Sequence, residues 1–171
     1  MCIRDRLDPG VPLVIPQINA EDIFKHQGII ANPNCATIIA LMAVAPIYRL
    51  SRITRMIVST YQAVSGAGAA GLAELKRQIA QLEAGQAVSA EAFPVQIAYN
   101  LIPQIGGFDE QGYSAEERKL QDEGRKILHD PALKISCTCV RVPVLRCHSE
   151  SITLETCLLY TSIYSTKRLP E

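Results

Sequence analysis

One cysteine of the sequence stands where a helix is expected to begin. Cys35 follows the turn Asn32-Pro33-Asn34 and precedes a segment that is apolar at helical spacing from about Thr37. A thiol at a helix N-terminus lies near the partial positive charge of unpaired amides, which favours the nucleophilic thiolate. Free cysteines are more often small buried side chains, so a nucleophile at a cleft and a buried apolar residue both remain open.

A glycine-rich segment, Ser65–Gly71, is the second candidate. It contains a literal G-x-G-x-x-G between an expected strand and an expected helix, and Glu91 follows Gly71 by 20 residues. That spacing is typical of the ribose-binding acid in dinucleotide-binding folds. However, a helix and the cysteine turn precede the strand, and no regular second βαβ unit follows. The segment therefore predicts either a close approach of a phosphate or amide ligand to backbone N–H groups, or a tight turn with close helix packing.

Two charged residues of a third expected helix lie one turn apart. Glu116 and Lys119 face the same way, whereas Glu117 is assigned to a capping box with Ser114. The pair either binds a ligand or is a solvated surface ion pair.

The segment Arg141–His148 carries the fourth constellation. Arg141 ends a strand that is otherwise mostly apolar, so its guanidinium needs a partner, and its fork suits a carboxylate. His148 follows a proline-interrupted stretch and could act as a general base near neutral pH, although an exposed loop histidine is equally compatible.

The same region offers a rival metal site. Cys137, Cys139, Cys147 and His148 lie within 12 residues of one another. Their C-x-C…C-H spacing does not match the usual structural zinc patterns, so we expect no metal.

The elements that must position these residues follow from periodicity and turn signals. Expected strands cover 53–64, 133–142 and 150–155, with a short strand near 96–102; expected helices begin near Thr37, after the glycine-rich turn and near Ala115. Residues 7–34 are turn-rich and extended, and Pro46 is expected to bend or end the first helix. Strand-helix-strand order followed by a run of strands predicts an α/β or α+β class.

Composition limits the possible functions. With 17 basic and 17 acidic residues the formal net charge is zero, which argues against nucleic-acid binding by bulk charge. Aromatic residues make up only 5% and tryptophan is absent, so a base-stacking platform is not expected. No membrane span or signal peptide is evident, and the six cysteines are therefore expected to be reduced thiols in the cytoplasm.

Taken together, these motifs resemble the aspartate-semialdehyde dehydrogenase family. The resemblance runs from about Leu13 to Thr156 and rests on Asn32–Cys35, Ser59–Gly68, Glu116–Lys119 and Arg141–Glu150 in family order. It implies catalytic roles for three residues: Cys35 as the nucleophile that forms an acyl thioester, Gln62 in positioning the substrate, and His148 as the acid/base. It implies substrate-binding roles for Asn34, Glu116, Lys119 and Arg141, with Arg141 on the carboxylate and Lys119 on phosphate, and cofactor-binding roles for Ser65 and Gly66.

The resemblance also implies an activity and an architecture. The activity is NADP-dependent reduction of aspartyl phosphate to aspartate semialdehyde, with release of phosphate, in lysine, threonine and methionine biosynthesis by a homodimer. The fold is a mixed β-sheet flanked by helices, like the catalytic and dimerisation domain of glyceraldehyde-3-phosphate-dehydrogenase-like enzymes. The Rossmann domain is absent, so the chain alone is expected to be inactive. Residues 7–156 form this domain, whereas 1–6 and 157–171 do not resemble the family.

Two other functions remain open: a non-catalytic dimerisation fragment, and an enzyme like acetylglutamyl-phosphate reductase. The enzymatic interpretation further predicts that Cys35, Gln62, Glu116, Arg141 and His148 meet in one cleft.

Overall fold

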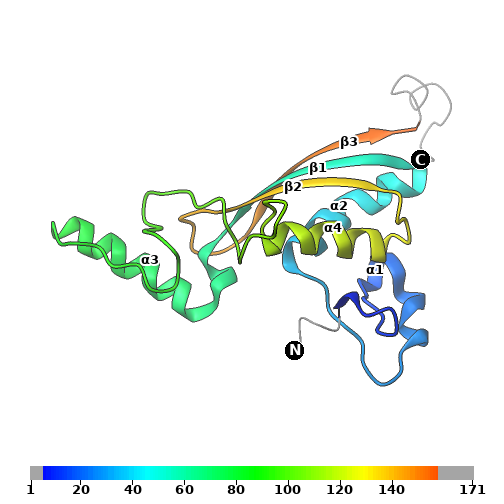
Figure 1. Ribbon diagram of the computed structural model, residues 1–171, viewed down its shortest axis with the longest axis horizontal. Helices are drawn as coiled ribbons and strands as arrows, with labels where there is room; N and C mark the ends of the chain where they lie inside the picture. The colour runs from blue at the N-terminus through cyan, green and yellow to red at the C-terminus, as the bar shows by residue number, and fades with distance from the viewer. Residues whose placement is uncertain (1–5, 158–171) are drawn as a thin grey trace, which may run out of the picture. The chain divides into compact units, whose positions relative to one another are not determined.

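The computed structural model describes residues 6–157 of the chain. Its elements are, in order, α1 (Pro16–Asn19), η2 (Ala20–Lys25), α2 (Cys35–Leu50), β1 (Ile53–Gln62), η3 (Val64–Ala67), α3 (Gly68–Glu83), α4 (Ala115–Ile127), β2 (Lys134–Arg141) and β3 (Ser149–Thr156) (Figure 1). The three main expected helices and three main expected strands are all present with shifted ends. The prediction that 7–34 is extended was wrong in part, because the short helices α1 and η2 lie there.

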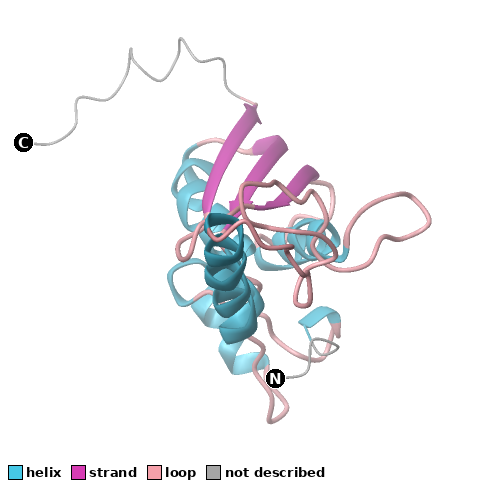
Figure 2. Ribbon diagram, turned by 90° about the vertical axis from the view of Figure 1, so that its left-hand side faces the viewer, coloured by secondary structure: helices cyan, strands magenta, loops and turns pink. Residues whose placement is uncertain are grey.

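The three strands form one sheet (Figure 2), in the order β2-β1-β3 (labelled in Figure 1). The N–H of Val142 donates to the Gln62 carbonyl, which brings the C-terminal ends of β1 and β2 together, so these strands are parallel. The N–H of Cys157 donates to the Arg52 carbonyl, so β3 runs antiparallel to β1. The predicted mixed sheet with helices is confirmed. Residues 96–102 form no strand, and Ile102 instead makes an isolated antiparallel bridge to Arg141.

The chain divides into two compact units, and each strand contributes residues to both. Of the described residues, the first unit contains 6–57, 121–136 and 152–157; the second contains 58–120 and 137–151. The tails that the sequence analysis set apart, 1–6 and 157–171, lie almost wholly outside the described residues.

The first unit is organised around α2. Its buried apolar side chains include Leu13, Leu41, Val44, Ile53, Met56 and Ile127. Pro46 does not end α2, which continues to Leu50. The opposite face of the helix is also apolar, and Ile39, Met42, Ile47 and Leu50 are exposed in the described part of the chain. Helices that are apolar on all sides are usually buried, so this face is suited to further packing.

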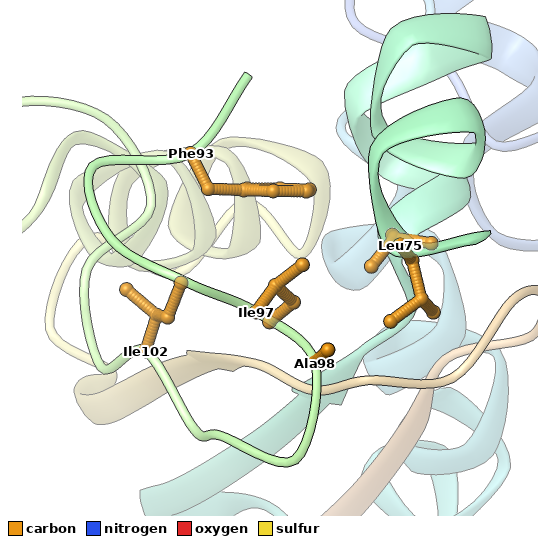
Figure 3. Close-up of a cluster of buried hydrophobic side chains, with 6 residues drawn as sticks. Leu75, Phe93, Ile97, Ala98 and Ile102 are labelled. Carbon is orange, nitrogen blue, oxygen red and sulfur yellow. The ribbon is translucent and has the colours of Figure 1, made fainter. Parts of the chain in front are cut away.

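The core of the second unit joins α3 to the long loop that follows it. Leu75 of α3 packs with Phe93, Ile97, Ala98 and Ile102 of the loop (Figure 3). A methyl group on Gly71 would lie 2.5 Å from the Val64 carbonyl oxygen, so this glycine is required for close packing.

Two buried polar side chains of α3 hold the same loop. The Gln78 amide oxygen accepts from the N–H groups of Ile97 and Ala98, at 2.9 and 3.0 Å. The Glu74 carboxylate accepts from the N–H groups of Glu91 and Ala92. The Glu91 carboxylate pairs with Arg77 at 3.0 Å, so this residue, considered above for ribose binding, ties the loop to α3.

Candidate active site

The cysteine turn of the first unit begins α2 as the sequence predicts. Asn34 is the N-cap: its side-chain oxygen accepts from the N–H groups of Ala36 at 2.9 Å and Thr37 at 3.4 Å. Cys35 is the first helical residue and is exposed. Its thiol is therefore accessible at the positive end of a 16-residue helix, as a nucleophile needs to be.

Glu123 of α4, which was not among the predicted site residues, supports this turn. Its side chain is 1% exposed, and one carboxylate oxygen accepts from the Asn34 N–H at 2.7 Å. The other oxygen pairs with Arg6 at 3.3 Å. The only signal in the sequence was a charged residue between Leu120 and Ile127 on the buried side of α4, a position that usually requires a partner.

We expect Cys35 to react first when the chain is treated with limiting iodoacetamide at neutral pH. Cys137 and Cys139 are buried, and the Cys137 thiol donates to the Glu117 carbonyl, whereas Cys35 is exposed at a helix N-terminus. Peptide mass spectrometry gives the order of labelling. Cys147 is the internal control, because it is exposed without a helix N-terminus; labelling of Cys147, Cys137 or Cys139 before Cys35 would contradict the assignment.

In the second unit, one residue holds two of the predicted site residues. The N–H of Ala63 donates to Nδ1 of His148 at 3.1 Å, and the Ala63 carbonyl accepts from the Arg141 guanidinium at 2.8 Å. The next two residues also bond to the loop that precedes His148. The N–H groups of Val64 and Ser65 donate to the carbonyls of Val144 and Leu145. We call Ala63, Gly66, Arg141 and His148 the Ala63 cluster.

Gly66 completes the cluster because it lacks a side chain. A Cβ there would lie 2.6 Å from a guanidinium nitrogen of Arg141 and 3.3 Å from Nε2 of His148. Any larger residue would therefore displace one of these two side chains. The Gly66 N–H donates to the Ala63 carbonyl and the Ser65 N–H to the Leu145 carbonyl, so neither backbone amide is the open donor that the sequence suggested.

The charge around His148 favours its neutral form. Burial lowers the pKa of His148 from its ordinary value, and the Arg141 guanidinium lowers it further, while the Glu116 carboxylate acts in the opposite direction. Glu116 is buried and pairs with Lys119 at 3.2 Å, as the helical spacing suggested. Because burial and Arg141 outweigh Glu116, the imidazole is predominantly uncharged at neutral pH.

Gln62 ends β1 directly before Ala63. It is 1% exposed, and its amide nitrogen donates to the Thr60 hydroxyl at 3.3 Å. Gln62, Glu116, Lys119, Arg141 and His148 thus all belong to the second unit, together with Ser65 and Gly66. Asn34 and Cys35 belong to the first. The single cleft expected to contain Cys35 and His148 stays a prediction.

Two further features are absent from residues 6–157. Their His, Cys, Asp and Glu side chains form no group of three or more arranged to hold a metal ion. Their helices are too short or too polar for a bilayer-spanning segment.

Known proteins are similar to this chain over most of its described length. A family model described as "Semialdehyde dehydrogenase, dimerisation domain" matches residues 44–164. An aspartate-semialdehyde dehydrogenase of Aquifex aeolicus is 54% identical over 154 residues, which are 88% of this chain and 45% of the relative. One of Bacillus subtilis is 45% identical over 157 residues, again 88% and 45%. The chain thus spans about half the length of the curated relatives it matches.

Solved structures show the same similarity. The crystal structure of aspartate semialdehyde dehydrogenase II from Vibrio cholerae, complexed with ASA, has a TM-score of 0.87 at 47% identity and covers 88% of this chain and 46% of that one. The enzyme of Candida albicans with NADP has a TM-score of 0.66 at 25% identity and covers 92% of this chain and 43% of that one.

Proposed function

We propose that this chain, which belongs to the semialdehyde dehydrogenase family, is the catalytic half of an NADP-dependent, phosphorylating aspartate-semialdehyde dehydrogenase. The observation that carries the proposal is the Ala63 cluster, in which one residue holds an arginine and a histidine side by side. The arginine can bind a carboxylate, and the histidine beside it can hydrogen-bond a carbonyl oxygen. The pair therefore suits a short substrate with a carboxylate and a reactive carbonyl carbon. The exposed Cys35 supplies the nucleophile that such chemistry requires.

In the proposed reaction the thiolate of Cys35 attacks the carbonyl carbon of aspartyl phosphate. The C–O bond to phosphate breaks, phosphate leaves, and a thioester forms on Cys35. After reduction of the thioester, the C–S bond breaks, which releases the aldehyde and restores the thiolate. NADPH, when bound, supplies the hydride for that reduction.

The other predicted residues orient the substrate. Arg141 binds the substrate carboxylate, and Glu116 binds the amino group. Lys119 and Asn34 bind near the phosphate and the reacting carbon, and Gln62 positions the acyl chain. His148, the expected acid/base, interacts with the carbonyl oxygen on which negative charge develops. Correct placement of these groups lowers the barrier because the reacting atoms need not be brought together from solution.

The segment around Ser65 and Gly66 fits a cofactor only in part. Gly66 and Gly68 are exposed and bring no side-chain bulk, so a flat ring or a phosphate can approach the backbone. The amides of Ser65 and Gly66 are already paired, so contacts there rest on the Ser65 hydroxyl and on close packing. We propose that these residues touch the reactive end of NADP. The remaining affinity must come from outside the described residues.

We also propose that the protein works as a homodimer. The matching family model is that of a dimerisation domain, and the chain has the apolar surface that self-association needs. Ile57 and Tyr61, both on the exposed side of β1, are each 45% exposed.

A domain graft tests the proposed function. Residues 7–157 would replace the matching segment of the Aquifex aeolicus relative, and phosphate-dependent reduction of NADP by aspartate semialdehyde would be followed by absorbance. We expect turnover by the graft and none by the 171-residue chain alone, since most dinucleotide affinity in such enzymes comes from a Rossmann turn. A folded, dimeric graft without activity would refute the proposal, and turnover by the chain alone would show that residues 65–71 form a working cofactor site.

A further inference from the structure

We propose that the main chain of Ala63 fixes His148 as the neutral Nε2–H tautomer, so that His148 acts as a hydrogen-bond donor to the substrate oxygen and not as a base. The inference rests on the proposed function for the identity of that oxygen. An acid/base assignment does not say which ring nitrogen of His148 carries the proton, and the inference specifies that nitrogen.

The tautomer follows from which group can donate. Ala63 is not a proline, so its backbone nitrogen always carries a hydrogen and can only donate. The N–H lies 3.1 Å from Nδ1 of His148, so Nδ1 must present its lone pair. In a neutral imidazole the proton then resides on Nε2. Protonation of Nδ1 would place two hydrogens against each other, which adds to the effects that keep the ring neutral.

The charged groups around the ring agree with a neutral imidazole. Arg141 faces His148 across the missing side chain of Gly66 and disfavours a second positive charge. Glu116 favours that charge but is itself paired with Lys119. Glu150, two residues along the chain, has no hydrogen-bond partner among residues 6–157 for either carboxylate oxygen, and burial raises its pKa to about 7. A titration of the whole chain near neutral pH would therefore report Glu150 as well, and the test must observe the imidazole nitrogens.

A donor at Nε2 is sufficient for the proposed chemistry. A base is needed only if Cys35 must be deprotonated in the active site, and a thiol at a helix N-terminus is already inclined to ionise. When hydride reaches the thioester, negative charge develops on the carbonyl oxygen, and an N–H aimed there stabilises it. A neutral imidazole is used in this way by triosephosphate isomerase. His148 keeps its proton throughout, so no further acid or base has to restore it.

Nitrogen-15 NMR of histidine-labelled 171-residue chain tests the tautomer directly. The sequence has three histidines, and a His148→Asn spectrum identifies the signals of His148 by their loss. We expect its Nδ1 to show the shift of an unprotonated nitrogen and Nε2 that of a protonated one from neutral pH to below pH 6.5. An Nδ1–H tautomer, or a protonated ring at neutral pH, would overturn the inference.

Ala63→Pro is the variant that removes the fixing hydrogen bond. Ala63 has φ −60° and ψ 153°, angles that proline adopts without strain, so the backbone should still fold. Proline has no backbone N–H to donate to Nδ1 of His148. We therefore expect the nitrogen-15 signals of His148 to become those of a mixture of the two neutral tautomers. The same tautomer in this variant would show that Ala63 does not determine it.

Kinetics of the graft separate a donor from a base. His148→Ala should lower kcat about 100- to 1,000-fold, as the loss of one oxyanion donor does. His148→Gln keeps an N–H near the position of Nε2 but cannot titrate, and should recover kcat to within about tenfold of the parent. If glutamine is as inactive as alanine while NMR shows the Nε2–H form, His148 is a base in turnover and the inference fails. An inactive parent graft would instead count against the proposed function and leave the NMR result standing.

Discussion

Replacing Cys35 with serine in the grafted enzyme is expected to lower phosphate-dependent turnover of aspartate semialdehyde at least about 1,000-fold. The side chains are nearly the same size, and the cap at Asn34 does not involve the sulfur, so α2 should begin at the same residue. What changes is the nucleophile. A hydroxyl at a helix N-terminus remains protonated at neutral pH, whereas a thiol there is readily ionised.

Initial rates at saturating substrate, compared with the thermal unfolding of each variant, measure this effect. Cys157→Ser is the matched control, because Cys157 is also an exposed cysteine and lies at the end of β3. It should retain the parent rate. A Cys35→Ser graft that keeps more than about a tenth of the activity would show that the thioester is not on the reaction path.

Replacing Glu123 with alanine in the 171-residue chain is expected to lower the free energy of unfolding by about 3 to 5 kcal/mol. The substitution removes a carboxylate that is 1% exposed and that holds two partners. It leaves the Asn34 N–H without its acceptor and the Arg6 guanidinium without its counter-charge. Both losses add to the cavity left by the side chain.

Urea unfolding followed by circular dichroism measures the loss. Asp122→Ala is the control on the same helix, since Asp122 is 43% exposed and its ion pair with Arg125 should contribute less than about 1 kcal/mol. Equal effects of the two substitutions would mean that Glu123 does not support the turn. The rate of Cys35 alkylation gives a second measurement, because a loosened Asn34 turn should slow it relative to Cys147.

Features formed between near neighbours in the chain were predictable. The start of α2 follows from Asn34, whose side chain reaches N–H groups two and three residues ahead. The capping interaction of α4 is also local: the Glu117 carboxylate accepts from the Ser114 N–H at 2.7 Å. The Ser114 hydroxyl, the other half of the expected box, has no hydrogen-bond partner in the described part of the chain. Local composition likewise placed strands: 53–64 is β-branched and apolar, and apolar and polar residues alternate over 150–155.

Partners that are distant in the sequence were not predictable in the same way. The guanidinium of Arg141, whose fork was expected to suit a carboxylate, donates to the carbonyl of Ala63, 78 residues away. The Asn34 N–H meets Glu123 at a separation of 89 residues, and Ala63 meets His148 at 85. The apolar segment 96–102 had the composition of a strand, but its amides at Ile97 and Ala98 are used by Gln78 of α3.

The sequence by itself therefore determined which residue types stand at each position and which local elements present them. It placed Cys35 at a helix start, Arg141 at a strand end and His148 in a following loop, because these features depend on interactions over a few residues. Only the tertiary structure decided which side of the imidazole faces a donor, and hence which nitrogen carries the proton. That choice depends on a backbone N–H brought to His148 by the packing of β1 and the 142–148 loop, and no property of the residues around position 148 specifies it.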